Sequence, residues 1–348
     1  MHETSDFRSD KCALPTREMI EVMTEVSWGD GQSDKGPTVR ELERLAAELT
    51  AKQAALFTAT GTLANQLAIQ AHTRPGEEII VDENCHIVCS EAGAAAILSG
   101  VQTFSLASRE GRMDLLHLER VLARAEKGAR DTLVCTENTH NFGGGRVMPL
   151  DYLNEVRALA TRHGAKVHMD GARITNASVR SGVSVAEYAA TADSVMFCLS
   201  KGLCAPAGSV LCGDEEFIRR ARHFRDWIGA APKQPAPLAK CGIIALTTMV
   251  DRLKEDHDHA TKLEAGLRSI PWVDRRLDIE ISETNMVFMT LKEGDPDAFI
   301  AALAKEHVRA YHIANGRLRF VTHRDIDLDD VERAVQAIRK LLFRKGPR

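Results

Sequence analysis

Several features that mark other classes of protein are missing from this chain of 348 residues. Its 45 basic and 49 acidic side chains give a net charge of −4, so there is no basic excess to hold a phosphate backbone. The richest apolar stretch, Cys241 to Val250, is much shorter than the about 20 residues that a membrane helix needs. The first ten residues are polar and do not resemble a signal peptide. We therefore expect a soluble, cytoplasmic protein with no nucleic-acid or membrane partner.

The eight cysteines include no C-x-x-C pair, which excludes the common spacings of structural zinc sites. Several cysteines lie inside apolar runs, such as Cys135 after Leu133-Val and Cys198 after Met196-Phe. This pattern indicates buried thiols in a reducing compartment, and no metal site is predicted.

What remains, 44% apolar and 27% charged residues, is typical of a globular protein with a large core. From residue 38 to about residue 213, helix-period segments alternate with short apolar runs, which predicts βαβ units around a mostly parallel sheet and an α/β fold. The expected helices are Thr38–Lys52, Thr62–His72, Leu115–Lys127, Leu150–His163 and Val183–Ala190. The expected strands are Ala55–Thr58, Glu78–Val81, Gln102–Leu106, Thr132–Thr136, Lys166–Met169, Ser194–Cys198 and Ser209–Cys212.

A different pattern follows in the C-terminal part. One long helical pattern runs from Pro237 to about Ile270, with the charged stretch Glu255–His259 on a face that we expect to be exposed. Strand-like and helix-like segments then alternate at 285–291, 296–307, 310–313, 318–322 and 328–343. We expect a large domain at 1–245, which includes an N-terminal arm, and a smaller α+β domain at 246–348.

Three short segments follow predicted strands in a fixed order: Thr60-Gly61-Thr62, Asp170-Gly171 and Ser200-Lys201-Gly202. Ligands of open α/β sheets gather at the carboxyl ends of the strands, so these segments are expected to meet at one site.

A helix start can hold a phosphate, although Thr60 would equally serve as an ordinary helix cap. Asp170 can likewise bind a ligand or cap a helix. Lys201, in a partly dry position, would keep the free lone pair with which an amine attacks an aldehyde. A phosphate cradle, an acid and then a lysine are the parts that pyridoxal phosphate requires.

The chain resembles the low-specificity L-threonine aldolases over nearly its whole length. The matching segments are Phe57–Thr62 with Asn65, Glu137–Asn141, His168–Arg173, Leu199–Gly202 and Arg319–His323. The resemblance implies the aspartate-aminotransferase-like fold, fold type I of the pyridoxal-phosphate enzymes, with a mostly parallel sheet between helices and a smaller C-terminal α+β domain. It also implies pyridoxal 5'-phosphate as cofactor. The expected assembly is a dimer or a dimer of dimers, hence a homotetramer, in which subunits share active sites.

The resemblance also assigns roles to individual residues. Lys201 matches the lysine that joins the cofactor aldehyde, and Asp170 matches the carboxylate that pairs with the ring nitrogen. His86 matches the histidine stacked on the ring, and His140 matches a second histidine near the substrate hydroxyl. The residues matched to the remaining cofactor contacts are Gly61, Thr62, Ser200, Lys233 and Arg173. Those matched to the substrate carboxylate are Ser9, Arg173 and Arg319.

These roles imply an aldehyde-lyase that cleaves L-β-hydroxy-α-amino acids to glycine and an aldehyde. Two arginines can fix the substrate carboxylate and so align the Cα–Cβ bond, while His86 or His140 takes the hydroxyl proton. Both histidines could instead be structural. The alternative reaction is β-elimination or dehydration of a β-substituted amino acid. A Rossmann dehydrogenase is disfavoured because no G-x-G-x-x-G follows the first strand.

Two segments depart from the family pattern. The family reads Tyr-Gly-Asp-Asp-Pro where this chain has Ser33-Asp-Lys-Gly-Pro37, so a loop tyrosine near the substrate is missing and Trp28 is a candidate to fill its space. Lys233 stands where the family usually has an arginine, and a lysine meets a phosphate as a point charge, not as a bidentate fork.

Two further motifs have ordinary interpretations. His257 and His259 are two residues apart, which does not place them on one helix face, so we expect a solvated stretch and no metal site. Gly143-Gly-Gly145 lacks the lysine and hydroxyl of a phosphate-binding loop and is expected to be a flexible connection.

Overall fold

A computed structural model describes residues 4–25, 36–127, 132–313 and 316–343, and the chain divides into two compact units. The large unit is Pro15–Val250, and the small unit combines Met1–Leu14 with Asp251–Arg348. The sequence prediction had placed the N-terminal arm in the large domain and the boundary at 245/246. The arm instead belongs to the small unit, because β1 (Ser5–Asp6) pairs in parallel with β13 (Val308–Arg309) and Phe7 packs against Phe320.

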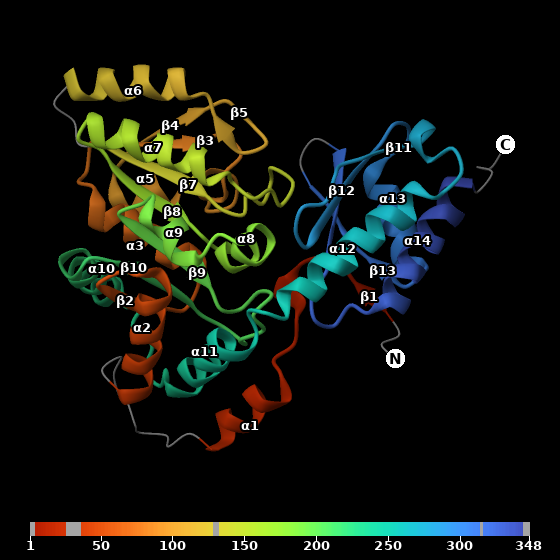
Figure 1. The fold of residues 1–348 in the computed structure, drawn as a ribbon, viewed down its shortest axis with the longest axis horizontal. Coiled ribbons are helices and arrows are strands. Elements are labelled where there is room, and N and C mark those ends of the chain that lie inside the picture. The colour runs from red at the N-terminus through yellow and green to blue at the C-terminus, as the bar shows by residue number, and fades with distance from the viewer. Residues whose placement is uncertain (1–3, 26–35, 128–131, 314–315, 344–348) are drawn as a thin grey trace. The chain divides into compact units, whose positions relative to one another are not determined.

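A seven-stranded sheet forms the centre of the large unit (Figure 1). In order across the sheet, the strands are β2 (Ala54–Thr58), β10 (Ser209–Gly213), β9 (Ser194–Cys198), β8 (Lys166–Asp170), β7 (Thr132–Glu137), β3 (Glu78–Asp82) and β4 (Gln102–Leu106). Only β10 runs antiparallel to its neighbours. The predicted α/β class and the mostly parallel sheet are confirmed.

Helices cover both faces of this sheet, which explains why most of its strands are apolar on both sides. One face packs Leu56, Met196 and Leu211 against α3 (Gly61–His72) and α10 (Glu215–Trp227). On the other face, Cys212 Sγ lies 3.8 Å from the carbonyl oxygen of Ala46 in α2 (Pro37–Thr50). The other helices of this unit are α1 (Arg17–Glu25), α4 (His86–Cys89), α5 (Ala94–Ser99), α6 (Leu115–Lys127), α7 (Leu150–Arg162), α8 (Ile174–Ser181), α9 (Val185–Ala190) and α11 (Ala236–Thr248). A short hairpin joins β5 (Ser108–Arg109) to β6 (Arg112–Met113).

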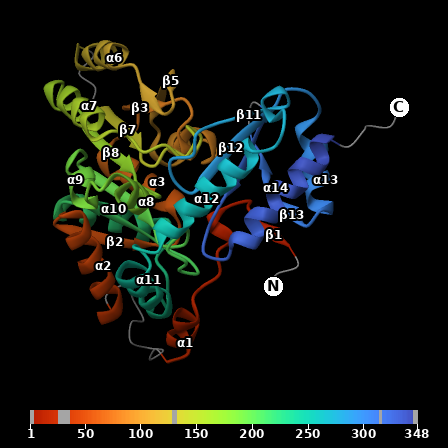
Figure 2. The ribbon, with the colours of Figure 1, turned by 45° about the vertical axis from the view of Figure 1, so that its right-hand side comes forward.

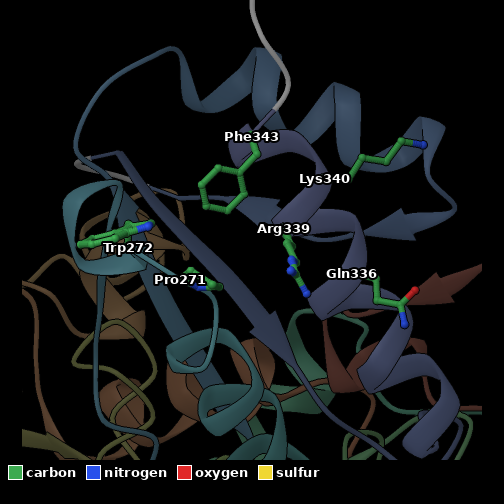
Figure 3. A pocket seen from close by; sticks show the side chains of 6 residues that line it. All are labelled: Pro271, Trp272, Gln336, Arg339, Lys340 and Phe343. Carbon is green, nitrogen blue, oxygen red and sulfur yellow. The ribbon is translucent and has the colours of Figure 1, made fainter.

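The small unit is α+β, with an antiparallel four-stranded sheet (Figure 2). The strand order is β11 (Leu277–Ile279), β12 (Met286–Leu291), β15 (Arg317–Val321) and β14 (Tyr311–His312). Its helices are α12 (Leu253–Arg268), α13 (Pro296–Lys305) and α14 (Leu328–Phe343). Phe7, Leu263, Val287 and Phe320 belong to its core. On its surface, Pro271 and Trp272 lie across an open hollow from the end of α14, and Figure 3 shows the side chains around it.

The single long helix predicted from Pro237 to Ile270 is wrong. α11 ends at Thr248, α12 begins at Leu253, and the boundary between the units lies in this break. Thr247 and Thr248 donate their hydroxyls to carbonyl oxygens of the preceding turn, a bonding pattern that weakens and bends helices.

The expected exposure of the stretch Glu255–His259 is also wrong in part, because Asp256, His257 and His259 are buried. Asp256 forms an ion pair with Arg252, and its carbonyl oxygen accepts a 2.6 Å hydrogen bond from the hydroxyl of Thr322, directly after β15. Burial raises the pKa of Asp256 to about 6.

All eight cysteines lie among the described residues, and none of them forms a disulfide bond. Six are buried as predicted, whereas Cys12 is half-buried and Cys89 is exposed. Within the described parts of the chain, no helix is long and apolar enough to cross a membrane.

The N-terminal arm is expected to stabilise the small unit specifically. Phe7→Ala removes a fully buried ring from the core of that unit and should cost about 3–5 kcal/mol of its unfolding free energy. Hydrogen exchange should show the loss in β12 and β15. Phe197→Ala, which removes an equally buried ring from the large sheet, is the control and should weaken β8 and β9 instead. An equal loss of protection in both units after Phe7→Ala would contradict this assignment.

Candidate active site

The three segments singled out in the sequence lie at one edge of the large sheet. β8 ends at Asp170, and its parallel neighbour β9 ends at Cys198, three residues before Lys201. β2 runs in the same direction as β9, because both are antiparallel to β10, and it leads into α3 at Gly61. The carboxyl ends of these strands therefore meet where a ligand of an open sheet is expected.

The carboxylate of Asp170 is almost fully buried, since the residue is 2% exposed. Its Oδ2 accepts a 2.8 Å hydrogen bond from Asn65 Nδ2, and its Oδ1 accepts one of 3.0 Å from the Ala172 amide. Burial acts to raise the pKa of this carboxyl, but the charges of His86 and Lys201 and the two hydrogen bonds bring it below the usual value. Asp170 is therefore held as an anion beside Lys201, whose residue is 8% exposed.

His86 begins α4, and its ring is held by a second buried acid. His86 Nδ1 lies 2.8 Å from Glu91 Oε1, and the His86 amide donates to Glu137 Oε2 at 2.7 Å. Burial acts to lower the pKa of His86, but Glu91 and the charges of Asp170 and Glu137 outweigh it and leave the pKa raised. Nε2 of His86 has no hydrogen-bond partner among the described residues, so it remains able to meet a ligand.

Ligating atoms of His86, Glu91 and Asp170 lie within 4.8 Å of one another, which raises the question of a metal ion. The amide of Asn65 donates to both carboxylates, at 2.8 Å to Glu91 Oε1 and 2.8 Å to Asp170 Oδ2. A hydrogen-bond donor thus already bridges the two acids. We interpret the group as a hydrogen-bonded cluster and not as a ligand set.

His140, the second histidine of the prediction, is hydrogen-bonded at Nδ1, and its Nε2 faces Asp82 at ion-pair distance without hydrogen-bond geometry. Its Nδ1 accepts a 2.9 Å hydrogen bond from the Gly143 amide, and its Nε2 lies 3.2 Å from Asp82 Oδ2. The residue is fully buried. Burial acts to lower its pKa, but Glu137 and Asp82 raise it above the usual value. His140 is thus a partner of Asp82 inside the large unit.

The expectation of a flexible Gly143-Gly-Gly145 connection is wrong. The Gly145 amide donates to the His140 carbonyl oxygen, and the His140 amide donates to that of Arg146, so the glycines form a tight turn around the ring. Gly111 closes the other side, where an added Cβ would come within 2.4 Å of the His140 ring.

The residues predicted to hold anionic groups in the large unit occupy different environments. Gly61 and Thr62 are the first residues of α3, where helix geometry leaves amide protons free for an anion, and Thr60 caps that helix at Leu63. An added Cβ at Gly61 would lie 2.9 Å from Met196 Cε, so glycine lets the helix start close to β9. The other three are Arg173, which is buried, Ser200, which is half-buried, and Lys233, which is exposed.

Ser9 and Arg319 belong to the small unit and lie near one another there. Arg319 on β15 donates through Nη2 to the carbonyl oxygen of Arg8 at 3.2 Å, directly before Ser9. Ser9 accepts the Lys11 amide through its hydroxyl and so begins a short 3-10 helix. Two of the three predicted carboxylate ligands therefore lie in the small unit, whereas Arg173 lies in the large unit. Ser33 and Trp28, which bear on the missing loop tyrosine, lie outside the described residues.

Sequence reasoning did not assign roles to Asn65, Glu91, Glu137 and His168. Asn65 Oδ1 lies 3.1 Å from His168 Nε2, His168 Nδ1 lies 2.9 Å from Ser194 Oγ, and that hydroxyl lies 2.8 Å from His72 Nε2. His168 is two residues before Asp170, so both side chains emerge on the same face of β8. This alternation of side chains along β8 is the signal in the sequence that could have linked His168 to Asp170.

Comparison with known proteins decides the family. The model of the β-eliminating lyase family matches residues 6–293. The chain belongs to the β-eliminating lyase family. A low-specificity L-threonine aldolase from Escherichia coli K12 is 37% identical over 347 residues, covering 97% of this chain and 99% of that protein. Low-specificity L-threonine aldolase 1 from Arabidopsis thaliana is 35% identical over 353 residues, covering 97% and 96%.

Solved structures agree on the fold of this family member. A threonine aldolase from Leishmania major aligns with a TM-score of 0.82 at 20% identity, covering 97% of this chain and 99% of that one. A serine palmitoyltransferase from Sphingomonas wittichii aligns with a TM-score of 0.78 at 17% identity, covering 97% and 86%. These likenesses confirm the resemblance noted in the sequence and the fold-type-I architecture.

His72, which lies at the far end of the hydrogen bonds that lead through Ser194 and His168 toward Asp170, predicts a pH dependence of stability. Burial lowers the pKa of His72 to about 3, whereas in the unfolded chain it is near 6.5. Between about pH 4 and 6 the unfolded chain therefore binds one more proton at this site, so stability rises with pH by about 1.4 kcal/mol per pH unit.

His72→Gln should reduce the pH slope of the unfolding free energy by that amount, as measured by urea denaturation at several pH values. His223→Gln, at an exposed position of α10, is the control and should leave the slope unchanged. A slope that is the same in the His72 variant and the original protein would disprove the buried neutral state.

Proposed function

We propose that this protein is a pyridoxal-phosphate-dependent lyase that cleaves L-β-hydroxy-α-amino acids to glycine and an aldehyde. The observation that carries the proposal is a buried, ionised Asp170 beside Lys201 at the carboxyl edge of the sheet. A family in which low-specificity L-threonine aldolases are about 35% identical over the whole chain supports the same reaction. A structural neighbour, a serine palmitoyltransferase, was solved with pyridoxal phosphate.

The residues at the sheet edge fit this cofactor. A protonated pyridine nitrogen needs an anion opposite it, and Asp170 is anionic despite its burial. A phosphate needs amide donors, and the start of α3 at Gly61 and Thr62 presents them. The cofactor aldehyde needs a primary amine that is partly shielded from water, and the buried Lys201 supplies one.

Each of these residues has a part in the proposed reaction. When bound, pyridoxal phosphate supplies an electron sink for the charge left at Cα as a bond to it breaks. Lys201 joins the cofactor, Asp170 holds the proton on its ring nitrogen, and Gly61, Thr62, Ser200 and Lys233 bind its phosphate group. Substrate and cofactor oxygens are held by the remaining predicted residues, Arg173, Ser9, Arg319 and His140. The two arginines fix the plane of the substrate carboxylate, which selects the Cα–Cβ bond.

His86 is the better candidate for the base. Glu91 holds its Nδ1 and leaves Nε2 available for the β-hydroxyl proton. Only the neutral form of His86 accepts a proton, and in that form the raised pKa makes it a stronger acceptor. As the Cα–Cβ bond breaks, that proton moves to His86, the aldehyde departs, and a proton returned to Cα gives glycine. His140 is bound at Nδ1 by the Gly143 amide and is buried against Asp82, so it has a supporting part there.

We further propose a homo-oligomer, a dimer or a homotetramer, that works in the cytoplasm. Val88, Ile97 and Leu98 are exposed apolar residues on α4 and α5, and a partner subunit would cover them. This surface adjoins His86, which supports shared active sites. The unpaired cysteines support a reducing compartment.

The reaction is tested by incubating the holoprotein with L-threonine, L-allo-threonine and L-phenylserine while glycine, aldehyde and ammonia are assayed separately. Glycine and aldehyde in equal amounts are expected. Ammonia with a keto acid and no glycine would establish β-elimination instead. Lys201→Ala should lose the visible absorbance of covalently bound cofactor, and a variant that keeps this absorbance would exclude Lys201 from its role.

The two histidines should differ in a matched pair of variants. His86→Gln removes the basic nitrogen and should lower kcat by about 10²–10⁴ while the cofactor stays bound. His140→Gln should lower thermal stability, because Asp82 loses a buried partner, but should lower kcat by less than about tenfold. Steady-state kinetics and thermal denaturation of both variants check this. A larger loss of kcat in the His140 variant would make His140 the base.

A further inference from the structure

Asn65 occupies a central place behind the proposed cofactor site. It lies on α3 with 1% of its surface exposed, and both protons of its amide group are used. One goes to Asp170 Oδ2 and the other to Glu91 Oε1, each at 2.8 Å. Glu91 in turn holds His86. A single amide therefore links the acid assigned to the ring nitrogen with the acid that orients the proposed base.

The orientation of this amide fixes every proton behind it. A flipped Asn65 would set its oxygen against two carboxylates, so Nδ2 faces the acids and Oδ1 must accept from His168 Nε2. Burial lowers the pKa of His168 to about 4, which leaves the ring neutral. Because its one proton is then needed on Nε2 for Asn65 Oδ1, we assign Nδ1 as an acceptor. Ser194 Oγ then donates to Nδ1 and accepts from His72 Nε2.

The result is a line of donors that all point toward the acids: His72 to Ser194, Ser194 to His168, His168 to Asn65, and Asn65 to Asp170 and Glu91. We call it the donor relay. Aligned hydrogen bonds polarise one another, so each strengthens the next. The relay thus favours the anionic form of Asp170 and adds no charge to the site.

We propose that Asn65 and His168 are positioning residues that keep Asp170 a strong, oriented anion for the ring-nitrogen proton of the cofactor. The inference rests on the proposed function and adds to it. A cation at position 168 would neutralise Asp170 and weaken its hold on that proton, whereas a buried neutral histidine strengthens the anion without competing for it.

The proton on the ring nitrogen is the measurement that separates this role from simple packing. The ¹⁵N chemical shift of labelled pyridoxal phosphate, bound without substrate, reports that proton directly and can be followed against pH. The charged and titratable groups that face Asp170 are His86, Lys201, Glu91, Cys135, Glu137, His140 and His168. The first variant replaces none of them.

Asn65→Leu keeps the approximate volume and removes the amide. The ring nitrogen should then lose its proton about one to two pH units lower than in the original protein, because a hydrogen bond to a charged group is lost. Gln66→Met is the matched control on the same helix. Gln66 donates to Glu91 Oε2 at 2.6 Å and has no hydrogen bond to Asp170, so the ring-nitrogen titration should not move.

A second pair of variants covers the case in which Asn65→Leu does not fold. His168→Phe breaks the relay and should shift the ring-nitrogen titration in the same direction, whereas His168→Gln can still donate to Asn65 and should restore it. Equal titration in Asn65→Leu and the original protein, or in His168→Phe and His168→Gln, would overturn the relay. A ¹⁵N signal from free cofactor only, in the original protein, would overturn the proposed function itself and the relay with it.

Discussion

A buried negative charge at the end of β8 is the constraint on which the large unit depends. An isolated carboxylate removed from water would take up a proton, and Asp170 avoids this because two cationic groups and two hydrogen-bond donors surround it. Those partners come from four separate segments: α3, α4, the turn after β8 and the loop after β9. The anion therefore requires the parallel sheet edge, because only there do these segments meet.

The same constraint explains why so many polar side chains lie inside an otherwise apolar unit. Glu91, Glu137 and Asp170 are three buried acids at one place, and their repulsion must be offset by donors from Asn65, Gln66, the His86 amide and the Asn141 amide. Neutral donors satisfy the acids without cancelling the charge that the site uses. Removing any one of them leaves a buried acceptor unsatisfied, which costs more than an ordinary surface hydrogen bond.

The sequence predicted the architecture of the large unit well, because strands covered on both faces are nearly continuous apolar runs and their ends carry glycine. β9 from Ser194 to Cys198 has the predicted bounds, and α3 begins within one residue of its prediction. The break after Thr248 was missed because neither proline nor glycine stands between Thr248 and Leu253 to mark it. The burial of Asp256 depends on residues distant in sequence, such as Thr322, and periodicity does not report those.

The sequence predicted only those residues of the candidate site that stand in a family motif. Asp170, Lys201 and His86 stand in short motifs, and the structure gives each an environment suited to its expected role. Asn65 stood in the same motifs, yet nothing in the sequence says that its two amide protons go to different acids. That division follows from the positions of the two acids, since Glu91 lies between α4 and α5 and Asp170 lies at the end of β8. A motif thus identifies which residues meet, whereas the direction of each hydrogen bond depends on the fold. In this protein that direction decides whether the groups behind Asp170 strengthen its charge or neutralise it.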